Sequence, residues 1–152
     1  MLRRRAFRYE TLLKVRRLRE EQQAQCLAEV RQAIAKTEQE LRSVQEEQSR
    51  TLEEVTQRAR DQFDASEIQY LYNYERFLAR RAVECDARLA ALRRQERERL
   101  TDLEKANRHK RVVERIKERH IALFRKEWNS FEQKLADEVA LRKRPSHDGV
   151  ER

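Results

Sequence analysis

Glycine and proline are almost absent from this chain. Its 152 residues hold one of each, Pro145 and Gly149, and both lie among the last eight positions. Tight turns, strand hairpins and phosphate-binding loops depend on these two residue types. The first 144 residues therefore exclude a compact, many-turned fold and a glycine-rich nucleotide loop, and they favour long helices.

Large apolar residues are also scarce. Leu, Ile, Val and Phe supply 34 of the 152 residues, which is little for a globular core but enough for two helices sharing one seam, since a coiled coil needs roughly two apolar positions in seven. No apolar run approaches the roughly 20 residues that span a bilayer, and none follows the basic start. We therefore expect neither a transmembrane segment nor a signal peptide. Disorder is the alternative, chiefly for the termini.

The residues that usually carry chemistry are few and scattered. Cys26 and Cys85 have no ligand-like spacing and fall at seam positions, so we expect reduced cysteines that pack between helices. His109, His120 and His147 have no metal-ligand spacing either. Carboxylates are many, but two helices alone form no cleft that would shift their pKa values. The sequence predicts no enzyme activity, no catalytic residue, no metal and no cofactor.

What is abundant is helix-forming residues. Ala, Glu, Lys, Leu and Arg make up 90 of the 152 residues, a composition typical of long helices and coiled coils. Apolar residues recur at alternating steps of three and four over residues 27–55, and again over 78–116 with a change of phase from Leu92 to Leu100. Between the two runs, Ser66 and Gln69 have the spacing of a capping box.

These patterns predict an all-α fold, a long antiparallel two-helix coiled-coil hairpin forming one domain. We expect helices over about 8–62 and 67–143, a bend at about 61–67 and a disordered tail over 144–152. A parallel homodimer of unbroken helices is the alternative. In the hairpin, facing residues have numbers that sum to about 130, so residues 121–142 extend beyond the first helix.

The extending segment carries an apolar face. Its members recur at steps of three and four: Phe124, Trp128, Phe131, Leu135 and Val139. Two interpretations stay open. Residues 1–9 could cover part of this face, or the face could bind a partner, since aromatic side chains are enriched in binding hot spots.

Charge is distributed unevenly. Residues 1–20 carry a net +6 and residues 107–152 a net +5, whereas 21–62 and 63–106 carry −3 and zero. A hairpin brings both basic segments to one end, which would attract acidic surfaces, nucleic acid or anionic lipid. A nucleic-acid site would place aromatic residues among the basic ones, but Tyr70, Tyr72 and Tyr74 lie at the neutral end. These tyrosines would either close the open end of the hairpin or form a second docking site.

Three stretches resemble the FliJ family, the soluble coiled-coil component of the bacterial flagellar type III export apparatus. They are residues 7–16 (FRYETLLKVR), Asn73-Tyr74 with Phe77, and residues 132–142 (EQKLADEVALR). The resemblance covers nearly the whole chain, with the stretches in the family's order. The YscO family of injectisome stalk proteins shares this architecture and is one alternative, and a generic structural coiled coil is another.

The resemblance implies a hairpin similar to the central stalk of rotary ATPases. It implies a terminal end that enters the hexameric export ATPase, a surface that contacts the export gate protein FlhA, and export chaperones as further partners. It also implies a cytoplasmic location, peripheral to the inner membrane, and a role in flagellum assembly and motility. Tyr74 and Phe77 carry over to the gate-facing surface. The expected gate-facing aromatics of the first helix are replaced by Glu46, Glu47, Gln48 and Thr51.

The ring-facing candidates come from two sources. The family pattern supplies Phe7, Tyr9, Leu12, Leu13, Glu132, Gln133, Lys134, Asp137, Glu138 and Arg142, and the apolar face adds Trp128, Phe131 and Leu135.

Overall fold

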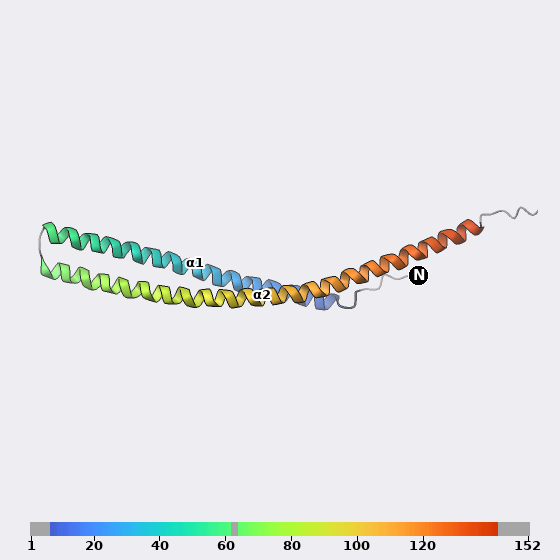
Figure 1. Ribbon diagram of the computed structural model, residues 1–152, viewed down its shortest axis with the longest axis horizontal. Helices are drawn as coiled ribbons and strands as arrows, with labels where there is room; N and C mark the ends of the chain where they lie inside the picture. The colour runs from blue at the N-terminus through green and yellow to red at the C-terminus, as the bar shows by residue number, and fades with distance from the viewer. Residues whose placement is uncertain (1–6, 62–63, 143–152) are drawn as a thin grey trace, which may run out of the picture. The chain divides into compact units, whose positions relative to one another are not determined.

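The computed structural model describes residues 7–61 and 64–142, and in these it contains two helices and no strand. Helix α1 spans Glu10–Asp61 and helix α2 spans Ala65–Arg142, and Figure 1 shows the chain reversing direction between them. The predicted antiparallel two-helix hairpin is confirmed. The predicted tail over 144–152 lies outside the described residues.

The chain divides into two compact units. The bend unit, residues 19–106, holds the reversal of the chain. The terminal unit holds residues 1–18 and 107–152. In each unit a stretch of α1 packs against a stretch of α2.

Ion pairs across the two helices define the register in each unit. In five of these pairs the residue numbers sum to 127–131, close to the expected 130; they are Arg31–Glu96, Glu38–Arg93 and Glu40–Arg88 in the bend unit, and Glu10–Lys117 and Arg17–Glu114 in the terminal unit. Their N–O distances range from 2.8 to 3.6 Å. Glu40 also reaches Arg81, and Arg58 pairs with Glu67 beside the bend, with sums of 121 and 125. The predicted pairing of the helices is therefore confirmed.

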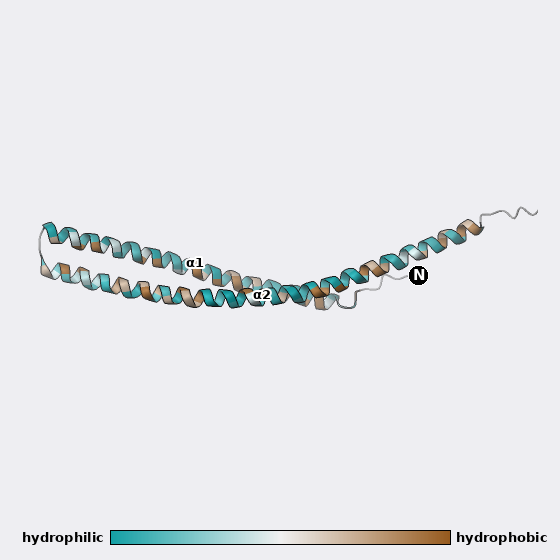
Figure 2. Cartoon of the chain, viewed as in Figure 1, coloured by the Kyte–Doolittle hydropathy of each residue, from teal (hydrophilic) through white to brown (hydrophobic). Residues whose placement is uncertain are grey.

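The seam of α1 follows the predicted heptad. Its buried members include Leu27, Val44 and Val55, together with two threonines, Thr37 and Thr51. Each threonine hydroxyl donates a hydrogen bond to the carbonyl oxygen four residues earlier, so neither is left unsatisfied in the interior. Figure 2 shows that hydrophobic (brown) positions are scattered along both helices among many hydrophilic (teal) ones.

The expected phase change in α2 is wrong. Leu100 and Ile116 are exposed, and the seam continues in unbroken steps through Glu96, Arg99 and Leu103. Glu96 is half-buried because Arg31 pairs with it at 2.8 Å, and the long stem of an arginine can cover apolar neighbours while its head reaches water. Helix α2 thus keeps the same heptad spacing, and some of its seam positions are occupied by polar side chains.

The cysteines lie where the heptad places them. Cys85 is buried in the seam of α2 and Cys26 is half-buried on α1, and both are free. Both cysteines therefore pack between the helices, as expected.

The start of α2 is capped by Asp64, two residues earlier than the Ser66 of the predicted capping box. The Asp64 Oδ1 atom accepts hydrogen bonds from the backbone N–H of Ser66 at 2.9 Å and from its hydroxyl at 2.7 Å. Ser66 is therefore a donor inside the first turn, not the cap. Aspartate is among the best N-cap residues because its oxygen accepts from the N–H groups that the helix leaves unpaired.

This cap predicts a pH dependence of stability. The Ser66 hydroxyl, and then its N–H, lower the pKa of the Asp64 carboxyl below its ordinary value of 3.8. A lowered folded-state pKa stabilises the fold above the unfolded pKa, and that contribution is lost as the pH falls through the folded value. We expect Asp64→Ala to lower the melting temperature at pH 7 and to flatten its acid dependence.

Asp64→Asn is the matched control, because asparagine caps helices about as well but does not titrate. It should keep most of the stability at pH 7 while losing the same acid dependence. Circular dichroism melts from pH 7 down to about pH 2, below the ordinary range of aspartate, measure both effects. An unchanged acid dependence in both variants would contradict the assignment.

Candidate protein-binding surfaces

The terminal unit concentrates the positive charge of the chain. Its residues include 20 basic and 9 acidic side chains, a net +11, while the bend unit carries −3. Both basic segments belong to this one unit, as the hairpin predicted. Its potential attracts acidic partners over a distance of about 10 Å at moderate salt.

An aromatic stripe runs along the last turns of α2. We define it as Phe124, Trp128, Phe131, Leu135 and Val139. The Trp128 ring lies 6.3 Å from Phe124 and 6.2 Å from Phe131, and its Nε1 donates a 2.7 Å hydrogen bond to Glu132. Every residue from 125 to 142 is exposed. The described part of the chain therefore leaves the stripe uncovered beyond Phe124.

The N-terminal aromatics reach only the edge of this stripe. The Phe7 ring lies 5.8 Å from His120 and 5.8 Å from Tyr9. Residues 1–6, which one interpretation places over the stripe, lie outside the described residues. Phe7 contacts α2 one turn before Phe124, so the aromatic residues of both chain ends belong to the same unit.

The ring-facing candidates differ in exposure. Leu13 is completely buried against α2, so it packs beneath this surface and is not open to a partner. Tyr9 and Leu12 are exposed. Beside them, Lys117 donates to Glu10 at 3.0 Å and lowers the pKa of that carboxyl. The other candidates are all exposed on the last turns of α2: Glu132, Gln133, Lys134, Asp137, Glu138 and Arg142.

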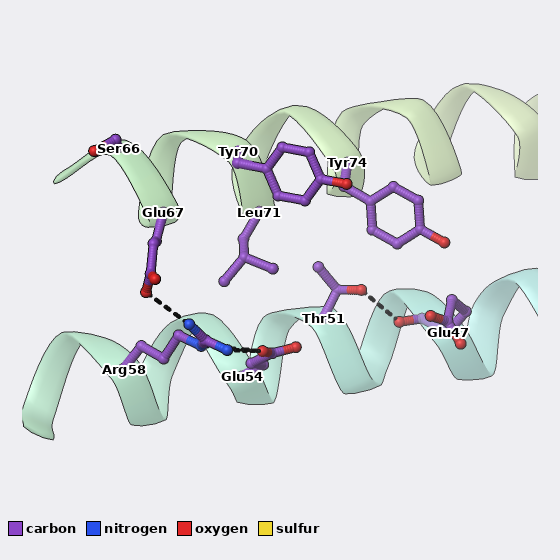
Figure 3. A pocket seen from close by; sticks show the side chains of 9 residues that line it. All are labelled: Glu47, Thr51, Glu54, Arg58, Ser66, Glu67, Tyr70, Leu71 and Tyr74. Carbon is purple, nitrogen blue, oxygen red and sulfur yellow. Dashed lines mark hydrogen bonds and ion pairs between the residues drawn. The ribbon is translucent and has the colours of Figure 1, made fainter. Parts of the chain in front are cut away.

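A second surface is a groove of about 580 Å³ in the bend unit (Figure 3). Leu71 and Thr51 are its buried members. Arg58 bridges its rim, at 2.6 Å from Glu67 and 2.9 Å from Glu54, and the hydrogen bond to Glu67 raises the pKa of the guanidinium further. Its lining residues are Glu47, Thr51, Glu54, Arg58, Ser66, Glu67, Tyr70, Leu71 and Tyr74.

The tyrosines do not close the end of the hairpin. Leu71 fills the seam there, while Tyr70 remains 71% exposed and Tyr72 is exposed as well. Tyr74 is half-buried and stacks on Phe77 at 6.3 Å. This arrangement fits the docking interpretation, because aromatic side chains stay at the surface beside a groove. The spacing of Tyr70 and Tyr74, one helical turn apart, was the available sequence indication of the groove.

The gate-facing candidates lie on this side of the bend unit. Tyr74 borders the groove opposite Glu47 and Thr51, and Phe77 lines a neighbouring recess with Glu40 and Arg81. Two of the polar residues of α1 that depart from the family pattern, Glu47 and Thr51, therefore line the groove with Tyr74. Gln48 is engaged across the seam, where its Nε2 donates to Glu75 at 2.7 Å.

Within residues 7–61 and 64–142, no group of three His, Cys, Asp or Glu side chains could hold a metal ion. Across the same ranges, neither helix has a stretch apolar and long enough to traverse a bilayer.

Comparison with known protein families identifies a relationship along most of the chain. The family model described as "Flagellar FliJ protein" matches residues 5–144, which is nearly the whole chain. No curated protein and no solved structure matches it.

Proposed function

Because this chain belongs to the FliJ family of the flagellar export apparatus, we propose that it is the non-enzymatic stalk of that apparatus. Its terminal unit inserts into the hexameric export ATPase, promotes assembly of the ring and thereby raises ATP turnover. Any nucleotide hydrolysis belongs to the ring. Through this action the chain supports flagellum assembly and motility.

The exposed aromatic stripe on the most basic part of the chain carries this proposal. The segment 125–142 is entirely exposed and includes Trp128, Phe131 and Leu135. In such an interface, buried aromatic and aliphatic anchors supply most of the short-range affinity. The net +11 of the terminal unit steers association and makes it sensitive to salt.

The bend unit provides the link to the export gate in this proposal. Tyr74 and Phe77 form a stacked pair at the edge of the groove, and FlhA is the proposed partner there. Export chaperones are a further class of partner. The protein would act in the cytoplasm, at the inner face of the membrane that holds the gate. The match to a flagellar family favours the flagellar system over the injectisome.

The proposal predicts that Trp128→Ala/Leu135→Ala reduces stimulation of the export ATPase by about tenfold or more, since two interface anchors are worth a few kcal/mol together. The measurement is ATP turnover by the export ATPase of the same genome, titrated with each variant. Helicity should not change, because both side chains are exposed.

The control is Val83→Ala, which shortens an exposed apolar side chain of the bend unit. It should stimulate like the unmodified protein, and so should Tyr74→Ala/Phe77→Ala, which should instead lose binding to the cytoplasmic part of FlhA. Full stimulation by the Trp128→Ala/Leu135→Ala variant would exclude the stripe as the contact.

A further inference from the structure

We propose that the terminal unit has a second docking surface, separate from the aromatic stripe, which binds an acidic amphipathic helix as the third helix of a bundle. The surface is an aliphatic flank, defined as Leu12, Val15, Val112, Ile116 and Leu123. All five side chains are 39–62% exposed.

The register brings the two halves of the aliphatic flank together. Glu10 pairs with Lys117 and Arg17 with Glu114, so Leu12 lies opposite Ile116, and Val15 opposite Val112. Each of these four residues comes one position before a seam residue. In an antiparallel pair, the residues that precede and those that follow the seam border opposite sides, so the flank lies on one side and the Arg17–Glu114 pair on the other.

Aliphatic residues are unusual in these positions. The residues that border a coiled-coil seam are commonly charged and pair across the helices. In the bend unit, the same side of the seam follows this rule: Glu40 accepts from Arg81 at 3.0 Å and from Arg88 at 3.3 Å. In the terminal unit, Leu12 and Ile116 take the corresponding places. An apolar border on both helices creates a second seam, and two helices alone cannot bury it.

The charge of the side chains around the aliphatic flank favours an acidic helix as its partner. Along this side, within residues 10–15 and 109–126, the helical spacing places His109, Arg119 and Lys126 among the five aliphatic residues and no acidic residue. Among the described residues, Arg119 makes no ion pair. A helix with an apolar stripe bordered by Glu or Asp would bury the aliphatics and pair with Arg119 and Lys126. A second copy of this chain would instead bring two strongly basic surfaces together.

The aliphatic flank and the aromatic stripe are different faces of α2. At about 100° per residue, they lie roughly 120° apart around the helix. Of the flank, Leu12 alone is also a ring-facing candidate. The terminal unit can therefore engage the ATPase ring through the stripe while the rest of the flank holds a helix from another protein. This inference goes beyond ring insertion and does not require it.

The test uses the full-length protein and two synthetic four-heptad helical peptides. Both have leucine at the seam positions, and they differ only in carrying Glu or Lys at the bordering positions. Fluorescence anisotropy should show the Glu peptide binding about tenfold more tightly than the Lys peptide. Val112→Gln/Ile116→Gln should weaken the Glu peptide about tenfold, and Arg119→Gln should weaken it less.

Two controls separate the faces. Val83→Gln/Leu100→Gln removes exposed aliphatics of α2 in the bend unit and should bind normally, as should Trp128→Ala/Phe131→Ala. A benzophenone group on the Glu peptide should crosslink to residues 112–123 of the unmodified protein, a readout that does not depend on how any variant folds. Stimulation of the ATPase by the Val112→Gln/Ile116→Gln protein should be unchanged, so failure here leaves the proposed function standing.

Three results would overturn the inference. One is equal affinity for the Glu and Lys peptides. Another is loss of binding in the Trp128→Ala/Phe131→Ala protein alone, which would place the peptide on the aromatic stripe. The third is sedimentation showing that the flank is occupied by a second copy of this chain.

Discussion

Replacing Leu13 by alanine should destabilise the terminal unit by about 2 to 4 kcal/mol, the range for removing a buried leucine side chain. Leu13 is 0% exposed and is the apolar seam residue of α1 nearest the chain start, with the polar seam residue Arg16 as its next neighbour. Amide hydrogen exchange, resolved by residue, should show faster exchange over residues 10–18 and 113–120.

Leu12→Ala is the matched control, one position away with the same side chain. Leu12 is 39% exposed, so we expect its replacement to cost less than about 1 kcal/mol, in line with the smaller area it buries. Equal exchange rates in the two variants would show that Leu13 does not hold the helices together. The bend unit should be unaffected by either change.

Deleting residues 121–152 should abolish stimulation of the export ATPase and leave the remaining hairpin folded. The last buried residue of α2 is Val113, and residues 125–142 are exposed throughout. The deletion therefore removes little of the core but the whole aromatic stripe. The measurements are ATP turnover and thermal melting by circular dichroism.

The melting temperature of the shortened protein should stay within a few degrees of the full chain, because exposed helix adds little tertiary stability. A large drop would mean that the stripe packs against the chain itself. Stimulation that survives the deletion would exclude the terminal end as the part that enters the ring.

Much of this architecture could be predicted from the sequence, because heptad spacing and the lack of glycine and proline leave few folds available. The seam from Leu27 to Val55 and the pairing near a sum of 130 follow from spacing alone. The seam beyond Leu92 could not be predicted from spacing, because the apolar residue Leu100 is exposed and the charged residue Glu96 is half-buried beside Arg31. A search for apolar spacing cannot identify a charged seam residue, because the residue that pairs with it lies on the other helix.

The surfaces were predictable to different degrees. The aromatic stripe is visible as steps of three and four, because one helix carries all of it. The aliphatic flank joins Leu12 to Ile116, which are 104 positions apart, so it exists only once the register is known. The cap was misplaced by two residues, from Ser66 to Asp64, because both residue types are good caps and only the backbone geometry decides between them.

The two glutamates Glu38 and Glu40 have different consequences for how the helices align. Sliding α2 by one heptad toward the chain start would still leave Glu40 facing an arginine, since both Arg81 and Arg88 reach it. The same slide would move Arg93 away from Glu38 and bring Asp86 against it, carboxylate against carboxylate. The Glu40 ion pair therefore does not distinguish the observed register from one shifted by a heptad, whereas repulsion between Glu38 and Asp86 would destabilise the shifted register.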